Sequence, residues 1–249
     1  MLIPENWSPP EASLQNRILL ITGAGNGIGA EVACACAAQG ATVVLLDKVV
    51  RSLEAVYDRI EAAGGPQPAI YPMDLEGATE KDYVDLANTL DSEFGRLDGL
   101  LHNAAMLGAL VPVAHFEVEL WYRILQINLN APFIMTRACL GLLMKSEDAS
   151  VVFCSDSVGR HGKAYWGAYA VSKAGCENFM QTLADELEVN TPIRVNSLDP
   201  GAVATQLRNL AYPAENPERL AQPADVVRPF LYLLGGDSRG TTGQQFGIG

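Results

Sequence analysis

Two side chains, Tyr169 and Lys173, have types and spacing that could support acid and base chemistry. Residues four apart on a helix lie on one face, so we expect the phenol and the ammonium side by side. A tyrosine with an ordinary pKa of about 10 is a poor proton shuttle at neutral pH, and an adjacent ammonium lowers that pKa by stabilising the phenolate. The pair therefore predicts a general acid and base.

A glycine-rich segment, Thr-Gly-Ala-Gly-Asn-Gly-Ile-Gly at residues 22–29, could bind phosphate groups. Glycines permit a tight turn and a close approach of the backbone, and a helix that begins in the turn presents free N–H groups and a partial positive charge. This combination is typical of a site for the pyrophosphate of a dinucleotide. The expected contacts are Gly23, Asn26, Gly27, Ile28 and Gly29.

A carboxylate follows this turn at the distance expected for a ribose contact. Asp47 ends an apolar run about 20 residues beyond the turn, where it could accept hydrogen bonds from the adenosine ribose hydroxyls. Asp47 would repel a 2′-phosphate, although the neighbouring Lys48 could weaken that repulsion. The residues therefore favour NAD, with NADP as the less favoured cofactor.

The segments that must position these residues alternate between short apolar runs and longer helical patterns, which is typical of βαβ units. We predict one domain of the α/β class with a mostly parallel sheet of seven strands, each buried on both faces. The predicted strands are 18–22, 42–46, 69–71, 99–102, 151–154, 194–197 and about 245–248. The predicted helices are 27–39, 51–63, 81–94, a long one within 118–145, about 168–188 and 224–233.

The composition agrees with a single domain and disfavours several other classes of protein. The length of 249 residues suits one α/β domain, which we place at residues 17–249 after an N-terminal arm of residues 1–16. The formal charge of −12 disfavours nucleic-acid binding. The chain has no run of about 18 apolar residues, so we expect no membrane partner.

The cysteines and histidines indicate neither disulfides nor a metal site. Five cysteines lie in apolar stretches without a CxxC pair, and their odd number suits reduced thiols. The three histidines are isolated, and none sits at a metal-ligand spacing from a cysteine or another histidine, so no metal is expected. Residues 1–16 lack the basic and apolar regions of a signal peptide. We therefore expect a cytoplasmic protein.

With these motifs the chain resembles the classical short-chain dehydrogenase/reductase (SDR) family over about residues 17–248. Its TGxxxGxG motif matches residues 22–29, and its tyrosine and lysine match Tyr169 and Lys173. The other matches, in chain order, are Asp74-Leu75, Asn103-Ala104-Ala105 in place of Asn-Ala-Gly, Asn128, and the PGxVxT motif at residues 200–205.

The resemblance implies a Rossmann fold with a doubly wound sheet, helices on both faces, and hydride transfer between a nicotinamide dinucleotide and a carbonyl or secondary alcohol. Tyr169 would exchange a proton with the substrate oxygen, Lys173 would hold the nicotinamide ribose, and Asn128 would position a water that relays protons. The implied cofactor contacts beyond the glycine turn are Asp47, Asp74, Leu75, Asn103, Ala104, Lys173, Pro200, Gly201, Val203 and Thr205.

The string Ser-Val-Gly-Arg-His-Gly at 157–162, followed by Trp-Gly-Ala-Tyr at 166–169, resembles a narrower branch, the YciK-like bacterial oxidoreductases. This resemblance implies a homo-tetramer or homodimer built through the long helices, with a small-molecule substrate. Asp47 departs from the basic residue associated with NADP in that branch. The chemistry of Asp47 therefore favours NAD as the cofactor. The alternative function is that of an NADP-dependent carbonyl reductase.

One position departs from the family pattern in the catalytic region. The family usually places a serine 13 residues before the tyrosine, but here that residue is Asp156, whose carboxylate would repel a developing alkoxide. We expect Ser157 to supply the hydroxyl through a one-residue adjustment of the loop, which Gly159 could tolerate. Two alternatives stay open: a protonated Asp156 that donates a hydrogen bond, or a weakly active protein that binds dinucleotide as a sensor or scaffold.

Three segments, 106–112, 157–166 and 205–222, are expected to fold over the substrate. Residues 211–222 contain prolines and charges and are either a mobile cover or a plain connection. Apolar side chains in these segments suggest an apolar lining, or ordinary packing under a loop. They are Leu107, Leu110, Tyr165 and Trp166.

Overall fold

The seven short apolar runs form the strands of one parallel sheet. The computed structural model describes residues 1–248, so Gly249, the last residue of the predicted domain, lies outside the described residues. The strands are β1 (Ile18–Thr22), β2 (Thr42–Asp47), β3 (Ala69–Pro72), β4 (Gly99–His102), β5 (Ser150–Cys154), β6 (Arg194–Asp199) and β7 (Gln245–Gly247). Their order, β3-β2-β1-β4-β5-β6-β7, changes direction between β1 and β4. The predicted doubly wound Rossmann fold is therefore confirmed.

The central strands are buried, whereas the two edge strands are only partly so. Every residue of β4 and β5 is buried. In β3, Pro72 is exposed and the other residues are half-buried, and in β7 only Phe246 is buried. The prediction of seven fully buried strands is wrong for β3 and β7, because each has a neighbouring strand on one side only.

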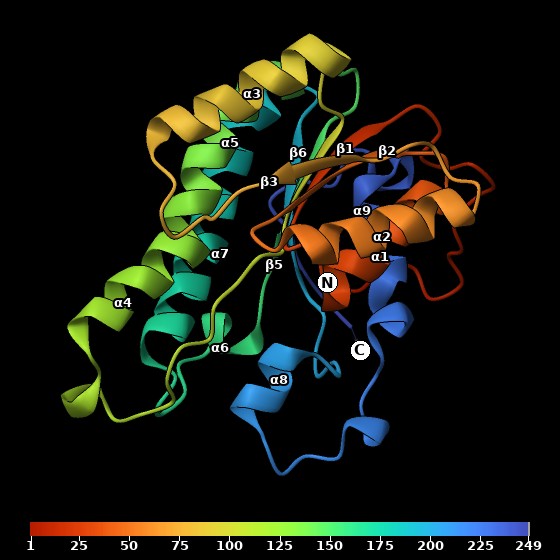
Figure 1. The fold of residues 1–249 in the computed structure, drawn as a ribbon. Helices are drawn as coiled ribbons and strands as arrows, with labels where there is room; N and C mark the ends of the chain where they lie inside the picture. The colour runs from red at the N-terminus through yellow and green to blue at the C-terminus, as the bar shows by residue number, and fades with distance from the viewer. Residues whose placement is uncertain (249) are drawn as a thin grey trace.

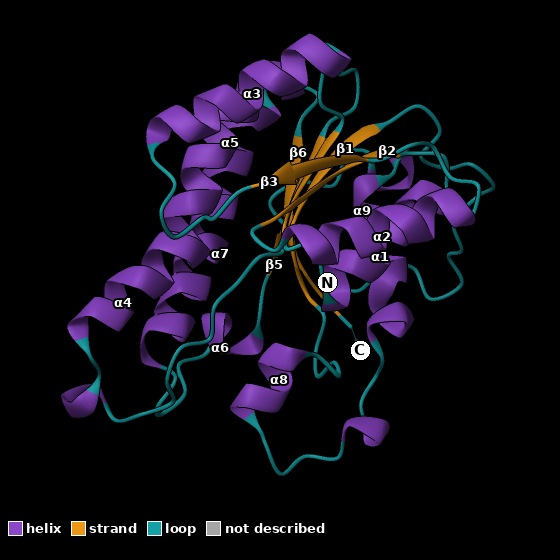
Figure 2. Cartoon of the chain, in the orientation of Figure 1, coloured by secondary structure: helices purple, strands orange, loops and turns teal. Residues whose placement is uncertain are grey.

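Helices cover both faces of this sheet (Figures 1 and 2). They are α1 (Gly27–Ala38), α2 (Val50–Ala62), α3 (Glu80–Phe94), α4 (Val118–Leu125), α5 (Ala131–Leu143), α6 (Ser157–Arg160), α7 (Gly167–Glu188), α8 (Gln206–Ala211) and α9 (Val227–Leu234). Successive side chains of a strand point to opposite faces. Leu20 of β1 accordingly packs in the core beneath α3, α5 and α7, whereas Leu19 and Ile21 pack in the core beneath α1, α2 and α9.

Most predicted helices begin and end within one residue of their predicted limits. The long helix within 118–145 is instead divided by a π-helical turn, η2 (Gln126–Asn130), a wide turn that is frequent at functional sites. The helices α6 and α8 were not predicted. None of the helices in residues 1–248 is long and apolar enough to cross a membrane.

Residues 1–16, at the start of the sequence, lie against α9 and β7, which come last in the sequence (Figure 1). The guanidinium of Arg228 donates to three backbone carbonyls within residues 4–7. The N–H of Gly247 donates to the carbonyl oxygen of Met1 at 3.0 Å. These bonds tie the arm to the sheet edge, and the division into an arm and a domain at residue 17 stays a prediction.

Candidate active site

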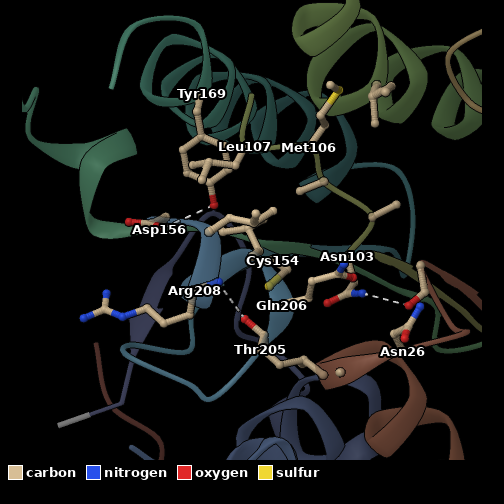
Figure 3. Close-up of a pocket in the computed structure, with 18 of the residues that line it drawn as sticks. Asn26, Asn103, Met106, Leu107, Cys154, Asp156, Tyr169, Thr205, Gln206 and Arg208 are labelled. Atoms are coloured by element: carbon tan, nitrogen blue, oxygen red, sulfur yellow. Dashed lines mark hydrogen bonds between the residues drawn. The ribbon is translucent and has the colours of Figure 1, made fainter. Parts of the chain in front are cut away.

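A cavity of about 900 Å³ opens at the carboxyl ends of the strands. This is the crevice in which open α/β sheets bind ligands. The glycine turn and the end of β2 line one part of the cavity, and Tyr169 and α8 line another. Figure 3 shows Asn26 of the turn, Tyr169 and Arg208 of α8 around this pocket. The cavity brings together Tyr169, Lys173 and every predicted cofactor contact except Gly29. In the described chain, Asn128 and Ser157 do not line it.

The glycines of the turn are needed for close packing. A Cβ atom on Gly23 would lie 2.9 Å from the Cα of Ala104, and one on Gly29 would lie 2.2 Å from the carbonyl oxygen of Gly23. The side-chain amide of Asn103 donates to the carbonyl oxygens of Thr22 at 3.1 Å and Gly23 at 3.3 Å. The end of β4 therefore holds the turn in its shape.

The start of α1 offers the donors that a pyrophosphate needs. In the described part of the chain, Asn26 at the N-cap makes no side-chain capping bond, and the N–H of Ala30 donates to the carbonyl of Asn26. The N–H groups of residues 27–29 precede that bond and belong to the set that an α-helix leaves unpaired. The residues present therefore fit a dinucleotide phosphate.

Asp47 lies beside this turn at the end of β2. Its carboxylate accepts hydrogen bonds from the backbone N–H groups of Gly25 at 3.3 Å and Val49 at 3.2 Å. Asp74 caps the turn after β3 by accepting from the N–H of Glu76 at 3.1 Å. Both carboxylates line the cavity, at the positions expected for an adenosine moiety.

Tyr169 and Lys173 lie on one face of α7, as their spacing predicts. Both side chains are buried, and the ammonium nitrogen lies 5.7 Å from the centroid of the phenol ring. Lys173 donates to the carbonyl of Cys154 at 2.6 Å. Burial, and after it the charge of Asp156, raises the pKa of Tyr169 well above 10. The lowering of this pKa that the sequence predicts from Lys173 is therefore wrong for this structure, in which burial and the neighbouring carboxylate raise it.

Asp156, and not Ser157, faces the tyrosine. The hydroxyl of Tyr169 donates to Oδ2 of Asp156 at 3.3 Å (Figure 3). Asp156 is the N-cap of α6, and its Oδ1 accepts from the N–H of Val158 at 3.0 Å. Ser157 is exposed, and its hydroxyl donates to Asp156 at 3.2 Å. The expected one-residue adjustment is therefore absent, because the capping bond holds Asp156 toward the cavity.

Ser155, the residue before Asp156, belongs to a buried ionic cluster behind α6. Glu177, one turn after Lys173 on α7, accepts hydrogen bonds from the hydroxyls of Ser155 and Ser197 and from Arg160 at 2.9 Å. Arg160 also donates to the carbonyl of Phe246 at 2.8 Å. This cluster ties the segment after β5 to β6 and β7, and no periodic signal in the sequence indicates it.

Asn128 lies in the π-helical turn and is buried. Its side chain accepts from the N–H of Met106 at 2.8 Å and donates to the carbonyl of the same residue at 2.9 Å. It also donates to the hydroxyl of Ser172 at 3.1 Å. The residue thus joins η2 to the loop after β4 and to α7, and its water relay stays a prediction.

The short helix α8 covers the part of the cavity next to Tyr169 and was missed in the sequence. Thr205 caps it by accepting from the N–H of Arg208 at 3.1 Å. A threonine before Leu207 and Leu210 is a helix-start signal that could have revealed it. Arg208, which no motif indicated, lines the cavity and pairs with Glu215 at 2.6 Å.

The apolar walls agree only partly with the prediction. Leu107 and Trp166 are buried and line the cavity. Tyr165 is 58% exposed, and neither it nor Leu110 is among the lining residues in the described range.

A contact that we call the latch joins the loop before α7 to α8 at the mouth of the cavity. Lys163 donates to the hydroxyl of Tyr212 at 2.7 Å, and its nitrogen lies 5.5 Å from the ring centroid of Trp166. The guanidinium of Arg208 lies 4.0 Å from the ring centroid of Tyr212. The latch, formed by Lys163, Trp166, Arg208 and Tyr212, therefore holds residues 205–212 over the cavity.

A doubly wound sheet with a glycine turn and a buried tyrosine–lysine pair in one cavity defines a dinucleotide-dependent oxidoreductase. The family model described as short chain dehydrogenase matches residues 17–216. The chain therefore belongs to the short-chain dehydrogenase/reductase family, whose members use a nicotinamide dinucleotide, and the resemblance found in the sequence is confirmed.

Individual relatives agree with the narrower resemblance. The chain is 43% identical to the uncharacterized oxidoreductase YciK of Escherichia coli K12, over 97% of this chain and 95% of that protein. A solved structure described as a short chain dehydrogenase from Pseudomonas syringae is 50% identical, with a TM-score of 0.96 and coverage of 97% and 98%. A Shigella flexneri 2a structure complexed with NADP is 44% identical, with a TM-score of 0.92 and coverage of 95% and 99%.

Proposed function

We propose that the protein transfers a hydride between a nicotinamide dinucleotide and a carbonyl or secondary alcohol carbon, with Tyr169 as the acid and base. The observation that carries this proposal is the cavity itself, which is lined by the glycine turn, by the buried hydroxyl of Tyr169 and by Lys173. A protein that only binds dinucleotide needs no such pair, which argues against a sensor or scaffold.

The bound dinucleotide supplies or accepts the hydride. During reduction, the hydroxyl of Tyr169 donates its proton to the substrate oxygen, and its raised pKa keeps that proton in place until the oxygen becomes basic. In the opposite direction the phenolate form of Tyr169 accepts the proton, so the hydroxyl must first release its own proton. Lys173 is available to hold the ribose beside the nicotinamide, and Asn128 fixes the loop and helix around them through Met106 and Ser172.

We propose NAD as the preferred cofactor because of Asp47. Its carboxylate lines the adenosine part of the cavity and would repel a 2′-phosphate. Two observations favour the second candidate, NADP: Lys48 also lines the cavity, and related structures 44% identical to this chain are complexed with NADP or NADPH.

Location and assembly stay predictions of the same proposal. All five cysteines are free thiols, which supports a reducing compartment such as the cytoplasm. Exposed apolar side chains on the long helices, Tyr122 on α4, Phe133 on α5 and Val171 on α7, support a homodimer or homo-tetramer built through those helices.

Titration of the protein with NADH and NADPH, together with turnover of a carbonyl panel by wild type and Tyr169→Phe, tests this function. We expect tighter binding of NADH, and a fall in kcat of about 10² to 10⁴ in Tyr169→Phe with unchanged dinucleotide affinity. Equal turnover by the two proteins would remove Tyr169 from its role. Binding without turnover by wild type would favour the sensor interpretation.

A further inference from the structure

The carboxylate of Asp156 enters the cavity without a cationic partner. Its Oδ2 accepts from the hydroxyl of Tyr169, and its Oδ1 accepts from Ser157 and from the backbone N–H of Val158. Within residues 1–248, no lysine or arginine forms a salt bridge with it. A half-buried carboxylate of this kind is stabilised best by a hydrogen-bonded cation.

The cations around Asp156 are engaged elsewhere. Lys173 donates to the carbonyl of Cys154 at 2.6 Å, Arg208 pairs with Glu215 at 2.6 Å, and Arg160 pairs with Glu177 at 2.9 Å. None of these three cations therefore forms an ion pair with the carboxylate beside Tyr169.

That charge opposes the chemistry at the substrate oxygen. An oxygen bonded to Tyr169 lies close to Asp156, because the two side chains are 3.3 Å apart. Negative charge develops on this oxygen as hydride is transferred, and an ionised carboxylate repels it. A donor or positive charge between Asp156 and the oxygen would relieve this repulsion as the reaction proceeds.

We infer that the substrate supplies this donor as an ammonium group on the carbon next to the reacting carbon, so that the substrate class is the vicinal amino alcohols and α-amino ketones. This inference rests on the proposed function. One ammonium carries three N–H donors, enough to bond Asp156 and the substrate oxygen together. Asp156 is then the residue that selects the substrate.

The reaction balances without any change at the nitrogen. In oxidation, the carbinol C–H bond breaks and its electron pair leaves with the hydrogen as a hydride to the dinucleotide. The O–H proton passes to the phenolate oxygen of Tyr169, which becomes the hydroxyl, and the carbon–oxygen bond becomes double. The ammonium keeps its three protons throughout.

The remainder of the substrate meets apolar walls. Leu107 and Trp166 are buried and line the cavity beside Tyr169, and Leu207 and Ala211 of α8 line it too and pack against them. An aryl or alkyl group suits this lining better than further hydroxyls do. A suitable probe is therefore 2-amino-1-phenylethanol, with 1-phenylpropan-1-ol as the isostere in which a methyl group replaces the ammonium.

The test compares kcat/KM for this pair in wild type and Asp156→Ser at pH 7, where the amine is protonated. In wild type, kcat/KM for the amino alcohol should exceed that for the neutral alcohol by about tenfold or more, because only the ammonium pairs with the charge of Asp156. Asp156→Ser should reduce that ratio to about one or less, since serine offers the neutral alcohol a donor. Asp58→Ser, which removes an exposed charge from α2, should leave the wild-type ratio unchanged.

The remaining outcomes contradict the inference. A wild-type preference for 1-phenylpropan-1-ol, or a ratio that Asp156→Ser leaves unchanged, overturns the inference and leaves the proposed function standing. So does oxidation of the neutral alcohol by Asp156→Ser alone. If neither protein oxidises either alcohol while both bind dinucleotide, the inference fails, and the carbonyl panel with Tyr169→Phe decides the proposed function separately.

Discussion

The hydroxyl of Tyr169 donates a 3.3 Å hydrogen bond to the carboxylate of Asp156. A carboxylate thus occupies the position where related proteins usually carry a serine, and it faces the group that must exchange a proton with the substrate. The electrostatics of the site therefore differ from those of the family pattern, even though the tyrosine and lysine are retained.

Replacing Asp156 with asparagine should lower the pKa of Tyr169. Burial is the larger cause of the raised pKa and persists in the variant, whereas the repulsion between carboxylate and phenolate is lost. A base that must be deprotonated becomes active at lower pH when its pKa falls. The rising limb of kcat against pH for alcohol oxidation should move to lower pH in Asp156→Asn, and a limb that stays in place would contradict this coupling.

Replacing Asp47 with glycine should shift the cofactor preference toward NADPH. The carboxylate lines the cavity at the end of β2, and its removal relieves repulsion of a 2′-phosphate worth on the order of 1 kcal/mol, or about fivefold in affinity. Isothermal titration measures the ratio of the NADH and NADPH dissociation constants. Asp58→Gly, on the exposed face of α2, is the control for loss of one negative charge away from the cavity. An unchanged ratio of dissociation constants in Asp47→Gly would remove Asp47 from the ribose site.

Replacing Glu177 with alanine should destabilise the fold. It leaves Arg160, whose side chain is only 20% exposed, without its carboxylate, and breaking a buried pair on one side costs about 3 kcal/mol. Urea unfolding should show this loss, whereas Glu186→Ala on the exposed face of α7 should change stability by less than about 0.5 kcal/mol. Similar midpoints for the two variants would mean that the cluster contributes little.

Replacing Tyr212 with alanine should loosen the latch over the substrate. The variant loses the bond from Lys163 and the stacking of Arg208 and should raise KM about fivefold to tenfold. Tyr212→Phe keeps the ring and should have a smaller effect. Faster tryptic cleavage after Arg208 or Arg219 in Tyr212→Ala would accompany the change, and a wild-type KM with wild-type cleavage would argue against a role for the latch in covering the substrate.

The sequence by itself determined the sheet, the glycine turn and the Tyr169–Lys173 pair, because each depends on local spacing. Apolar runs of strand length between helical patterns specify βαβ units, and a four-residue spacing places two side chains on one helix face whatever surrounds the helix. The departures at the edge strands arise because the number of neighbouring strands, rather than the local pattern, decides burial. The local pattern did not indicate the π-helical turn η2 either.

Only the tertiary structure decided which residue meets the tyrosine hydroxyl. The orientation of Asp156 and Ser157 depends on the capping bond to Val158 and on the position of α6 against α7, and neither can be read from residue spacing. The latch and the Glu177 cluster likewise join segments 17 to 86 residues apart. Contacts of that range form only when the sheet is assembled, and they decide the charge and shape of a pocket whose chemistry the sequence had already indicated.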